Sequence, residues 1–309
     1  MQVAAPDTSP VAPAPQPSVD SPWRRFAGEF AESRLALLGL GVLVLLIAIA
    51  LAAPFISPQN PYDLAQLDVL DSKLAPGEPS STTAKPYWLG TDDQGRDMLS
   101  AIFYGLRISL SVGVASTVIA LAIGLVLGLA AAYFGGWVDA AIMRVADIQL
   151  SFPAILIALI LLAILGQGVG KIIAALVTVQ WAYYARTVRS SALVERQKEY
   201  IEAAQVLALS QPRIVLRHLL PNCLPPLIVV ATVQVAHAIS LEATLSFLGL
   251  GLPITEPSLG LLIANGFQYL LSGKYWISFY PGVALLATIV SINLVADQLR
   301  DVLNPRLKK

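Results

Sequence analysis

The stretch LALLGLGVLVLLIAIALAA, residues 35–53, contains no charged side chain. As a helix it covers about 30 Å, which is the thickness of the hydrocarbon core of a bilayer. The whole chain of 309 residues is similarly apolar, with 56% hydrophobic residues, 13% charged residues and a mean hydropathy of +0.69. Because a soluble domain carries about a quarter charged residues, this composition predicts a protein that crosses the membrane several times.

Six apolar stretches are long enough to cross a bilayer as helices. They predict an all-α polytopic membrane protein with spans at 35–53, 107–133, 141–165, 172–190, 224–249 and 280–298. Lys and Arg are concentrated before the first span, after the fourth and after the sixth, which predicts that both termini are cytoplasmic. The segment 54–106 and the loop 250–279 then lie on the outer side of the membrane.

Composition also indicates the nature of the two tails and excludes several classes of function. Residues 1–34 predict a disordered, Pro/Ala-rich cytoplasmic tail, and residues 304–309 predict a second cytoplasmic tail. The net charge of zero gives no indication of nucleic-acid binding, and the single cysteine excludes an intrachain disulfide. The two histidines have no acidic neighbours at metal-ligand spacing, and no nucleophile–base pair is evident. We therefore expect no cofactor or metal on this chain and no catalysis by it.

Small residues recur at every fourth position of the second predicted span, at Ser116, Ala120, Gly124 and Gly128. Such a ladder lets a second helix approach closely. The ladder packs either within the chain or against a sister subunit, and the sequence leaves both interpretations open.

Three ionisable residues inside the predicted spans bear on the interpretation, namely Glu242, Arg144 and Asp147. Glu242 in the fifth span is costly in lipid, so it must face protein or a water-filled cavity. It either lines a pathway or gate, or holds helices together through hydrogen bonds. Arg144 and Asp147 are three residues apart in the third span and are predicted to pair on one helix face.

The segment EYIEAAQVLALSQPRIVLRHLLPN, residues 199–222, differs from its apolar surroundings. The charged side chains between 195 and 217 would each cost about 2.5–3.5 kcal/mol at the centre of a span, so the segment lies outside the bilayer. Its composition predicts a helix that ends at Pro212 and a second helix that runs to Pro221. The apolar side of these helices lies either in a groove on another protein or on the membrane surface.

This segment resembles the cytoplasmic coupling motif of ABC-importer permeases. That motif reads Glu-Ala-Ala, three residues, Gly, nine residues, Ile, one residue and Leu-Pro. The matching residues are Glu202, Ala203, Ala204, Leu220 and Pro221. The sequence departs from the motif at Ala208, where the family prefers Gly, and at His218, where it prefers Ile. The Ala at position 208 in place of Gly affects the geometry of the turn at that position.

The resemblance extends over roughly residues 24–308. The segments LGTDDQGRDMLSAIFYGLRISLSVG (89–113), LSFLGLG (245–251) and LRDVLNPRLK (299–308) are similar to parts of dipeptide, oligopeptide and nickel permeases. This resemblance implies a first span with an extracytoplasmic loop at 35–106 and a permease core at 107–303.

The resemblance also implies a function. The chain would be a non-enzymatic permease subunit of an ATP-driven importer for peptides or related small solutes in a bacterial inner membrane. Its partners would be a sister permease, two ATPase subunits carrying ATP and magnesium, and a substrate-binding protein outside. Closure of the ATPases would drive alternating access through the coupling segment. The alternative is an ion-coupled secondary transporter, which predicts inverted repeats and charged residues at the midplane.

Overall fold

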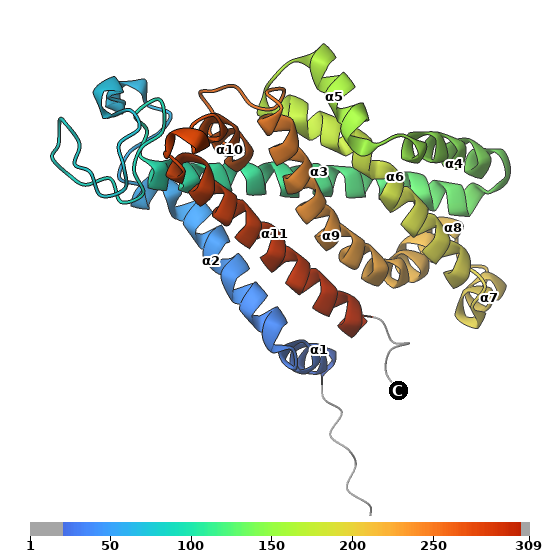
Figure 1. Cartoon of the computed structure of the whole chain (residues 1–309). Helices are drawn as coiled ribbons and strands as arrows, with labels where there is room; N and C mark the ends of the chain where they lie inside the picture. The colour runs from blue at the N-terminus through green and yellow to red at the C-terminus, as the bar shows by residue number, and fades with distance from the viewer. Residues whose placement is uncertain (1–20, 304–309) are drawn as a thin grey trace, which may run out of the picture.

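The computed structural model describes residues 21–303, in which every regular element is a helix (Figure 1). The α-helices are α1 Pro22–Ala31, α2 Arg34–Ile56, α3 Met98–Phe134, α4 Gly136–Ser151, α5 Ala154–Leu165, α6 Val169–Glu195, α7 Glu199–Val206, α8 Gln211–Ile214, α9 Leu220–Phe247, α10 Leu259–Phe267 and α11 Trp276–Leu303. The predicted tails at 1–20 and 304–309 lie outside the described residues.

Four helices in residues 21–303 are long and apolar enough to cross a membrane. They are α2, α3, the continuous helix Gln211–Phe247 that contains α9, and α11. These four helices correspond to the first, second, fifth and sixth predicted spans. The fourth predicted span lies within α6, which has 27 residues but is less apolar because it carries Lys171, Gln180 and Arg186.

The third predicted span is not one helix. Residues 141–165 fall on α4 and α5, which meet at an angle of 93°. Pro153 lacks the N–H that would continue α4, and it holds the preceding Phe152 in an extended conformation with φ −96° and ψ 143°. The prediction of a continuous helix here was wrong because the apolar run on both sides of the proline masks the break.

Polar side chains fasten α4 to α6. Ion pairs join Asp139 to Arg189 and Asp147 to Arg186. The predicted pairing of Asp147 with Arg144 on the same helix is therefore wrong, since the partner of Asp147 comes from α6 instead. Such pairs hold the bent α4–α5 unit against a helix that is distant in sequence.

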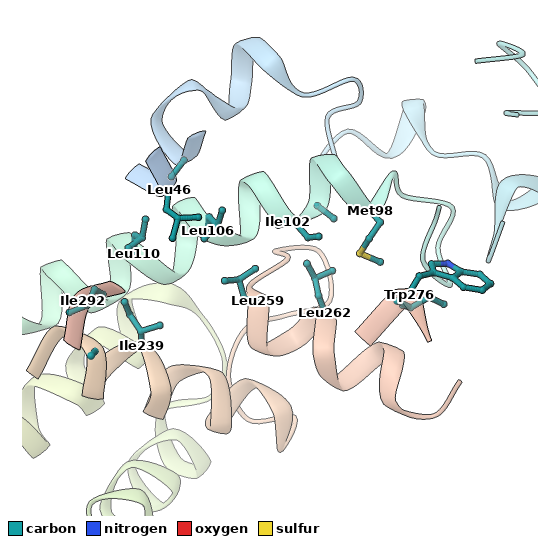
Figure 2. Close-up of a cluster of buried hydrophobic side chains, with 14 residues drawn as sticks. Leu46, Met98, Ile102, Leu106, Leu110, Ile239, Leu259, Leu262, Trp276 and Ile292 are labelled. Carbon is teal, nitrogen blue, oxygen red and sulfur yellow. The ribbon is translucent and has the colours of Figure 1, made fainter. Parts of the chain in front are cut away.

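The main hydrophobic core gathers side chains from α2, α3, α9, α10 and α11 (Figure 2). Leu106 and Leu110 on α3 lie among residues of α2, α9, α10 and α11, including Leu46, Ile239, Leu262 and Ile292. Helix α3 thus runs through the centre of the molecule and contacts most of the other long helices.

Three hydrogen bonds identify helix ends that lie together. The Arg196 guanidinium donates to the carbonyl oxygen of Ala132, which places the end of α6 beside the end of α3. The Gly168 amide donates to Gly251 over 3.4 Å, so the start of α6 lies beside the loop after α9. The Gln298 side chain donates to the carbonyl of Glu29 over 3.0 Å, which joins α11 to α1. Figure 1 shows α1 and the end of α11 on one side of the molecule, and α10 on the opposite side.

Part of the predicted disordered tail at 1–34 is a helix. Residues Pro22–Ala31 form α1, which the hydroxyl of Ser21 caps by accepting from the amide of Arg24. Proline at the first helical position favours this start, because its missing N–H would have no helical partner there. The Pro-rich composition of the preceding residues hid this short helix from the sequence prediction.

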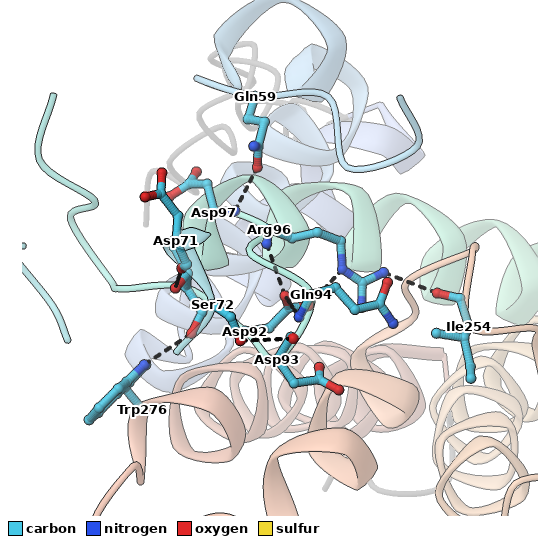
Figure 3. Close-up of polar contacts among 11 residues, drawn as sticks. Gln59, Asp71, Ser72, Asp92, Asp93, Gln94, Arg96, Asp97, Ile254 and Trp276 are labelled. Carbon is cyan, nitrogen blue, oxygen red and sulfur yellow. Dashed lines mark hydrogen bonds and ion pairs between the residues drawn. The ribbon is translucent and has the colours of Figure 1, made fainter. Parts of the chain in front are cut away.

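The loop at 57–97, named the cap below, is held by buried polar contacts (Figure 3). Arg96 and Asp92 form an ion pair of 2.6 Å with both side chains 1% exposed, and Arg96 also donates to the carbonyl of Ile254 over 3.0 Å. The Trp276 indole donates to the carbonyl of Thr91 over 3.2 Å. These bonds fix the cap to the start of α11 and to the loop before α10, so it is an ordered unit.

Glycine is required at one turn of the cap. Gly95 has φ +78°, and a Cβ added there would lie 2.1 Å from the carbonyl oxygen of Asp68. The turn brings Asp97 to the start of α3, where its carboxylate accepts hydrogen bonds of 2.9 and 2.5 Å from the amide and hydroxyl of Ser100. Helix α3 therefore begins at Met98, nine residues before the predicted span.

Candidate functional site: the segment between α6 and α9

Helix α7 carries the Glu-Ala-Ala residues, and it has two different faces. Ile201 and Ala204 are buried in a small cluster with Leu209 and Ile214. Glu202 and Ala203 lie on the exposed face. The three motif residues therefore divide between a face that packs on the segment itself and a face that is open.

The exposed face of α7 is apolar next to Ala203. Val206 is 85% exposed and Leu207 is 73% exposed, at three and four residues after Ala203. Leu216, after α8, is 63% exposed. Large apolar side chains that are grouped and uncovered on a short ordered segment are typical of a surface that binds a partner.

Helix α7 ends in a Schellman motif centred on Ala208. The amide of Leu209 donates to Ala204 over 3.2 Å, and the amide of Ala208 donates to Gln205 over 2.9 Å. Ala208 has φ +52°, a left-handed conformation that favours glycine. The sequence departs from the family motif at this position, yet the turn keeps the geometry that a glycine would give it.

The predicted role of Pro212 was wrong. The first helix ends at Val206, and Pro212 lies in the first turn of α8, where its missing N–H has no helical partner to lose. Its fixed φ instead helps the second helix to begin.

The second helix does not end at Pro221, as the sequence predicted. It continues through Pro221 into α9, so that Gln211–Phe247 is one continuous helix. A π-helical turn at Val215–Leu219 precedes the proline, and the amide of Leu220 donates to Val215, five residues back. This wider turn accommodates a residue that cannot donate a backbone hydrogen bond.

Polar contacts anchor the segment to the helix before it. The Glu195 carboxylate at the end of α6 accepts from Lys198 Nζ over 2.5 Å and from the Tyr200 hydroxyl over 2.6 Å. Arg196 is bound to the end of α3, as described above. Polar contacts thus hold the start of α7 and the packing of Ile201 and Ala204 holds its middle, while the face with Ala203 and Val206 remains open.

Glu242 lies on α9, far from this segment, and is 0% exposed. Its carboxylate accepts from the Ser246 hydroxyl over 2.7 Å and from the Ser109 hydroxyl on α3 over 3.1 Å. These contacts agree with a group that holds helices together. The predicted place of Glu242 on a pathway or gate stays a prediction.

The small-residue ladder lies in the contact between α3 and α6. Ser116, Ala120, Gly124 and Gly128 are all buried inside the chain. A Cβ added at Gly124 would lie 2.4 Å from Cβ of Tyr184, and one at Gly128 would lie 2.7 Å from Cβ of Val188. The close approach that the ladder permits is therefore used within the chain.

A cavity of about 930 Å³ lies between α6, α9 and α11, beside the segment. Its polar lining includes Glu195, Asn222, Gln234, Asp297 and Arg300. Sequence reasoning missed it, because these residues come from three distant helices and share no motif. Its walls at α6 and α9 are the two helices that the segment connects.

Comparison with known proteins places the chain among membrane transport components. The family model described as "Binding-protein-dependent transport system inner membrane component" matches residues 124–309, which include the segment, Glu242 and the cavity. The chain belongs to this family. A second model, the N-terminal TM domain of oligopeptide transport permease C, matches residues 21–76.

Curated relatives of this inner membrane component family match along nearly the whole chain. The dipeptide transport system permease protein DppC of Alkalihalophilus pseudofirmus is 36% identical over 306 residues, covering 98% of this chain and 96% of the relative. The di/tripeptide transport system permease protein DppC of Pseudomonas aeruginosa is 36% identical over 299 residues, covering 96% of this chain and 97% of the relative. The family resemblance inferred from the sequence is confirmed.

A solved structure shares the fold of this family member. A chain of the MetNI methionine ABC transporter, in its inward-facing conformations, aligns with a TM-score of 0.54 and 22% identity, over 67% of this chain and 98% of that chain. The chain is a multi-pass inner membrane protein built on an ABC permease fold.

Proposed function

We propose that the chain is the permease subunit of an ATP-driven importer for peptides or related small solutes, and that residues 196–221 couple it to an ATPase. The observation that carries the coupling proposal is the uncovered apolar face of Ala203, Val206 and Leu207 on a helix that is otherwise anchored. Relatives named as dipeptide and di/tripeptide permeases support the substrate class.

The helix ends that lie together support the proposal of six membrane crossings. The ends of α3 and α6 are neighbours, whereas the start of α6 lies beside the loop after α9. The α4–α5 unit must therefore cross back between them. Its two arms of about 24 and 18 Å, set at nearly a right angle, span about 30 Å, which is enough for a bilayer. With the Lys and Arg distribution, this arrangement supports cytoplasmic termini and an outward-facing cap.

The coupling can be described mechanically. The exposed face of α7 seats in a groove on the ATPase subunit, which holds the ATP and magnesium. Movement of that subunit displaces α7 and, through the continuous helix from Gln211, tilts α9. The cavity between α6 and α9 then changes width, because its two walls are joined by the displaced segment. A sister permease completes the pathway, and a binding protein delivers substrate on the outer side.

The experiment compares two bulky substitutions on α7. The tagged chain is purified in mild detergent from its native membrane, and the ATPase that co-purifies is quantified together with peptide uptake. We expect Ala203→Trp to reduce both by about tenfold or more, equivalent to about 1.4 kcal/mol of binding. Gln205→Trp is the control, since Gln205 is exposed on the same helix outside the apolar face.

Two outcomes would contradict the proposal. Parent-like ATPase recovery and uptake with Ala203→Trp would remove the coupling role from α7. Uptake by the purified chain alone under an ion gradient, with no ATPase present, would favour the secondary transporter.

A further inference from the structure

Helix α1 separates apolar from polar side chains. At helical spacing, one face carries Trp23, Phe26, Ala27 and Phe30, and the opposite face carries Arg24, Arg25, Gly28 and Glu29. A helix of this short length gains little from propensity alone, so its stability depends on what covers its apolar face.

The protein covers only one end of the apolar face of α1. Phe30 is 9% exposed and packs with Ala36 of α2 and Val295 of α11. At the other end, Trp23 is 81% exposed, with its ring edge toward Phe26 at a centroid distance of 6.4 Å. The face is thus continuous from a packed phenylalanine to an uncovered tryptophan.

The position of α1 indicates what covers the uncovered end. α2 follows after Glu32 and Ser33, and the Ser33 hydroxyl caps α2 by accepting from Ala36 over 3.2 Å. α2 is about 35 Å long and uncharged from Leu35 onward, so it fills the bilayer and Arg34 lies at the membrane surface. Figure 1 shows α1 at the end of α2. Because only two residues join the two helices, α1 lies at the depth of the lipid headgroups.

We propose that α1 is a membrane-surface helix whose Trp23, Phe26 and Ala27 lie at the boundary between acyl chains and phospholipid headgroups. Trp is favoured at this depth because its ring is apolar and its N–H finds polar partners. Arg24 and Arg25 on the other face attract the phosphates of anionic phospholipids. The Gln298 bond and the packing of Phe30 tie this helix to the end of α11, so it anchors two spans at one membrane surface.

The test places a fluorophore on each face of α1. Ala27→Cys and Gly28→Cys are made in the full chain, labelled with an environment-sensitive dye and placed in nanodiscs of phosphatidylglycerol and phosphatidylcholine with brominated acyl chains. Both positions tolerate the change, because Ala27 is exposed and a Cβ at Gly28 meets nothing within 4 Å. The parent protein serves as the labelling blank, since Cys223 is fully buried.

We expect several-fold stronger quenching at position 27 than at position 28. Adding Trp23→Ala and Phe26→Ala should reduce the quenching at position 27 without changing the thermal midpoint of the protein. Equal quenching at the two positions would overturn the proposal, whether both are strongly quenched or both are not. So would quenching at position 27 that persists after the two aromatic side chains are removed.

Discussion

The hydroxyl of Ser109 on α3 donates a hydrogen bond of 3.1 Å to Oε2 of Glu242 on α9. The other carboxylate oxygen accepts from Ser246 over 2.7 Å, one turn further along α9. The acidic side chain therefore ties α9 to α3 through Oε2, while Oε1 is satisfied within α9. The cost of placing it among apolar helices is offset by these contacts.

Glu242→Gln should preserve this joint, because an amide can accept from one serine and donate to the other. We expect unchanged recovery of the protein and a fall of a few degrees at most in its thermal midpoint. Glu242→Ala should lower the free energy of unfolding by about 2–5 kcal/mol, because it leaves two buried hydroxyls beside a void. Thermal unfolding in detergent measures both. Wild-type uptake by the Gln variant across pH would remove Glu242 from the pathway.

Gly124→Ala should destabilise the contact between α3 and α6. The added methyl group would lie 2.4 Å from Cβ of Tyr184 and 2.6 Å from the carbonyl oxygen of Trp181, so the helices must separate. Overpacking of this kind costs about 1–3 kcal/mol. Gly41→Ala on α2 is the matched control, because a Cβ there meets nothing within 4 Å. Thermal midpoints that fall equally for the two variants would contradict this account.

Ala208→Gly should stabilise the end of α7. Removing the left-handed strain gains about 1 kcal/mol, which corresponds to roughly fivefold slower exchange of the amides in the Schellman motif. Hydrogen exchange of the peptide containing Leu209 measures this effect. Ser210→Gly is the control, since Ser210 has an ordinary φ of −61°. Unchanged protection in Ala208→Gly would mean that Ala208 is not strained.

Asp71 in the cap should make this loop sensitive to acid. Burial by itself raises the pKa of the Asp71 carboxyl, but hydrogen bonds from Ser81, Ser80 and Tyr87 outweigh it and hold that pKa below its usual value. The ionised carboxylate therefore stabilises the cap above a pH of about 4, and this contribution is lost as the pH falls through the lowered pKa.

Asp71→Asn should weaken the cap at neutral pH and remove this part of its acid sensitivity. The fluorescence of Trp88, an exposed residue of the cap, reports the transition when the signal of Trp88→Phe protein is subtracted. An acid transition of the same size in Asp71→Asn protein would rule out Asp71 as its source.

The long spans could be predicted from the sequence because their length alone carries the signal. Residues 35–53 lie within α2 for this reason. Helix ends were less predictable. α3 extends to Met98 beyond the apolar run, and only the cap residue Asp97 marks that start. Pro153 marks the break between α4 and α5 in the sequence. The residues on both sides of it are equally apolar, so the whole run was predicted to be one span.

The motif located the candidate site, whereas its geometry depended on contacts that the sequence does not display. The spacing from Glu202 to Pro221 identified the segment, but the left-handed Ala208 and the π-helical turn before Pro221 follow from packing. The cavity beside it could not be predicted, since α6, α9 and α11 meet only in three dimensions.

The continuous helix Gln211–Phe247 joins the proposed coupling segment directly to a membrane span. It is not straight, because a π-helical turn at Val215–Leu219 and the prolines that follow lie near its start. Figure 1 shows the helix changing direction between α8 and the long part of α9. Under the coupling proposal, a push on the exposed Leu216 is transmitted along α9 to Glu242, whose bond to Ser109 joins α9 to α3.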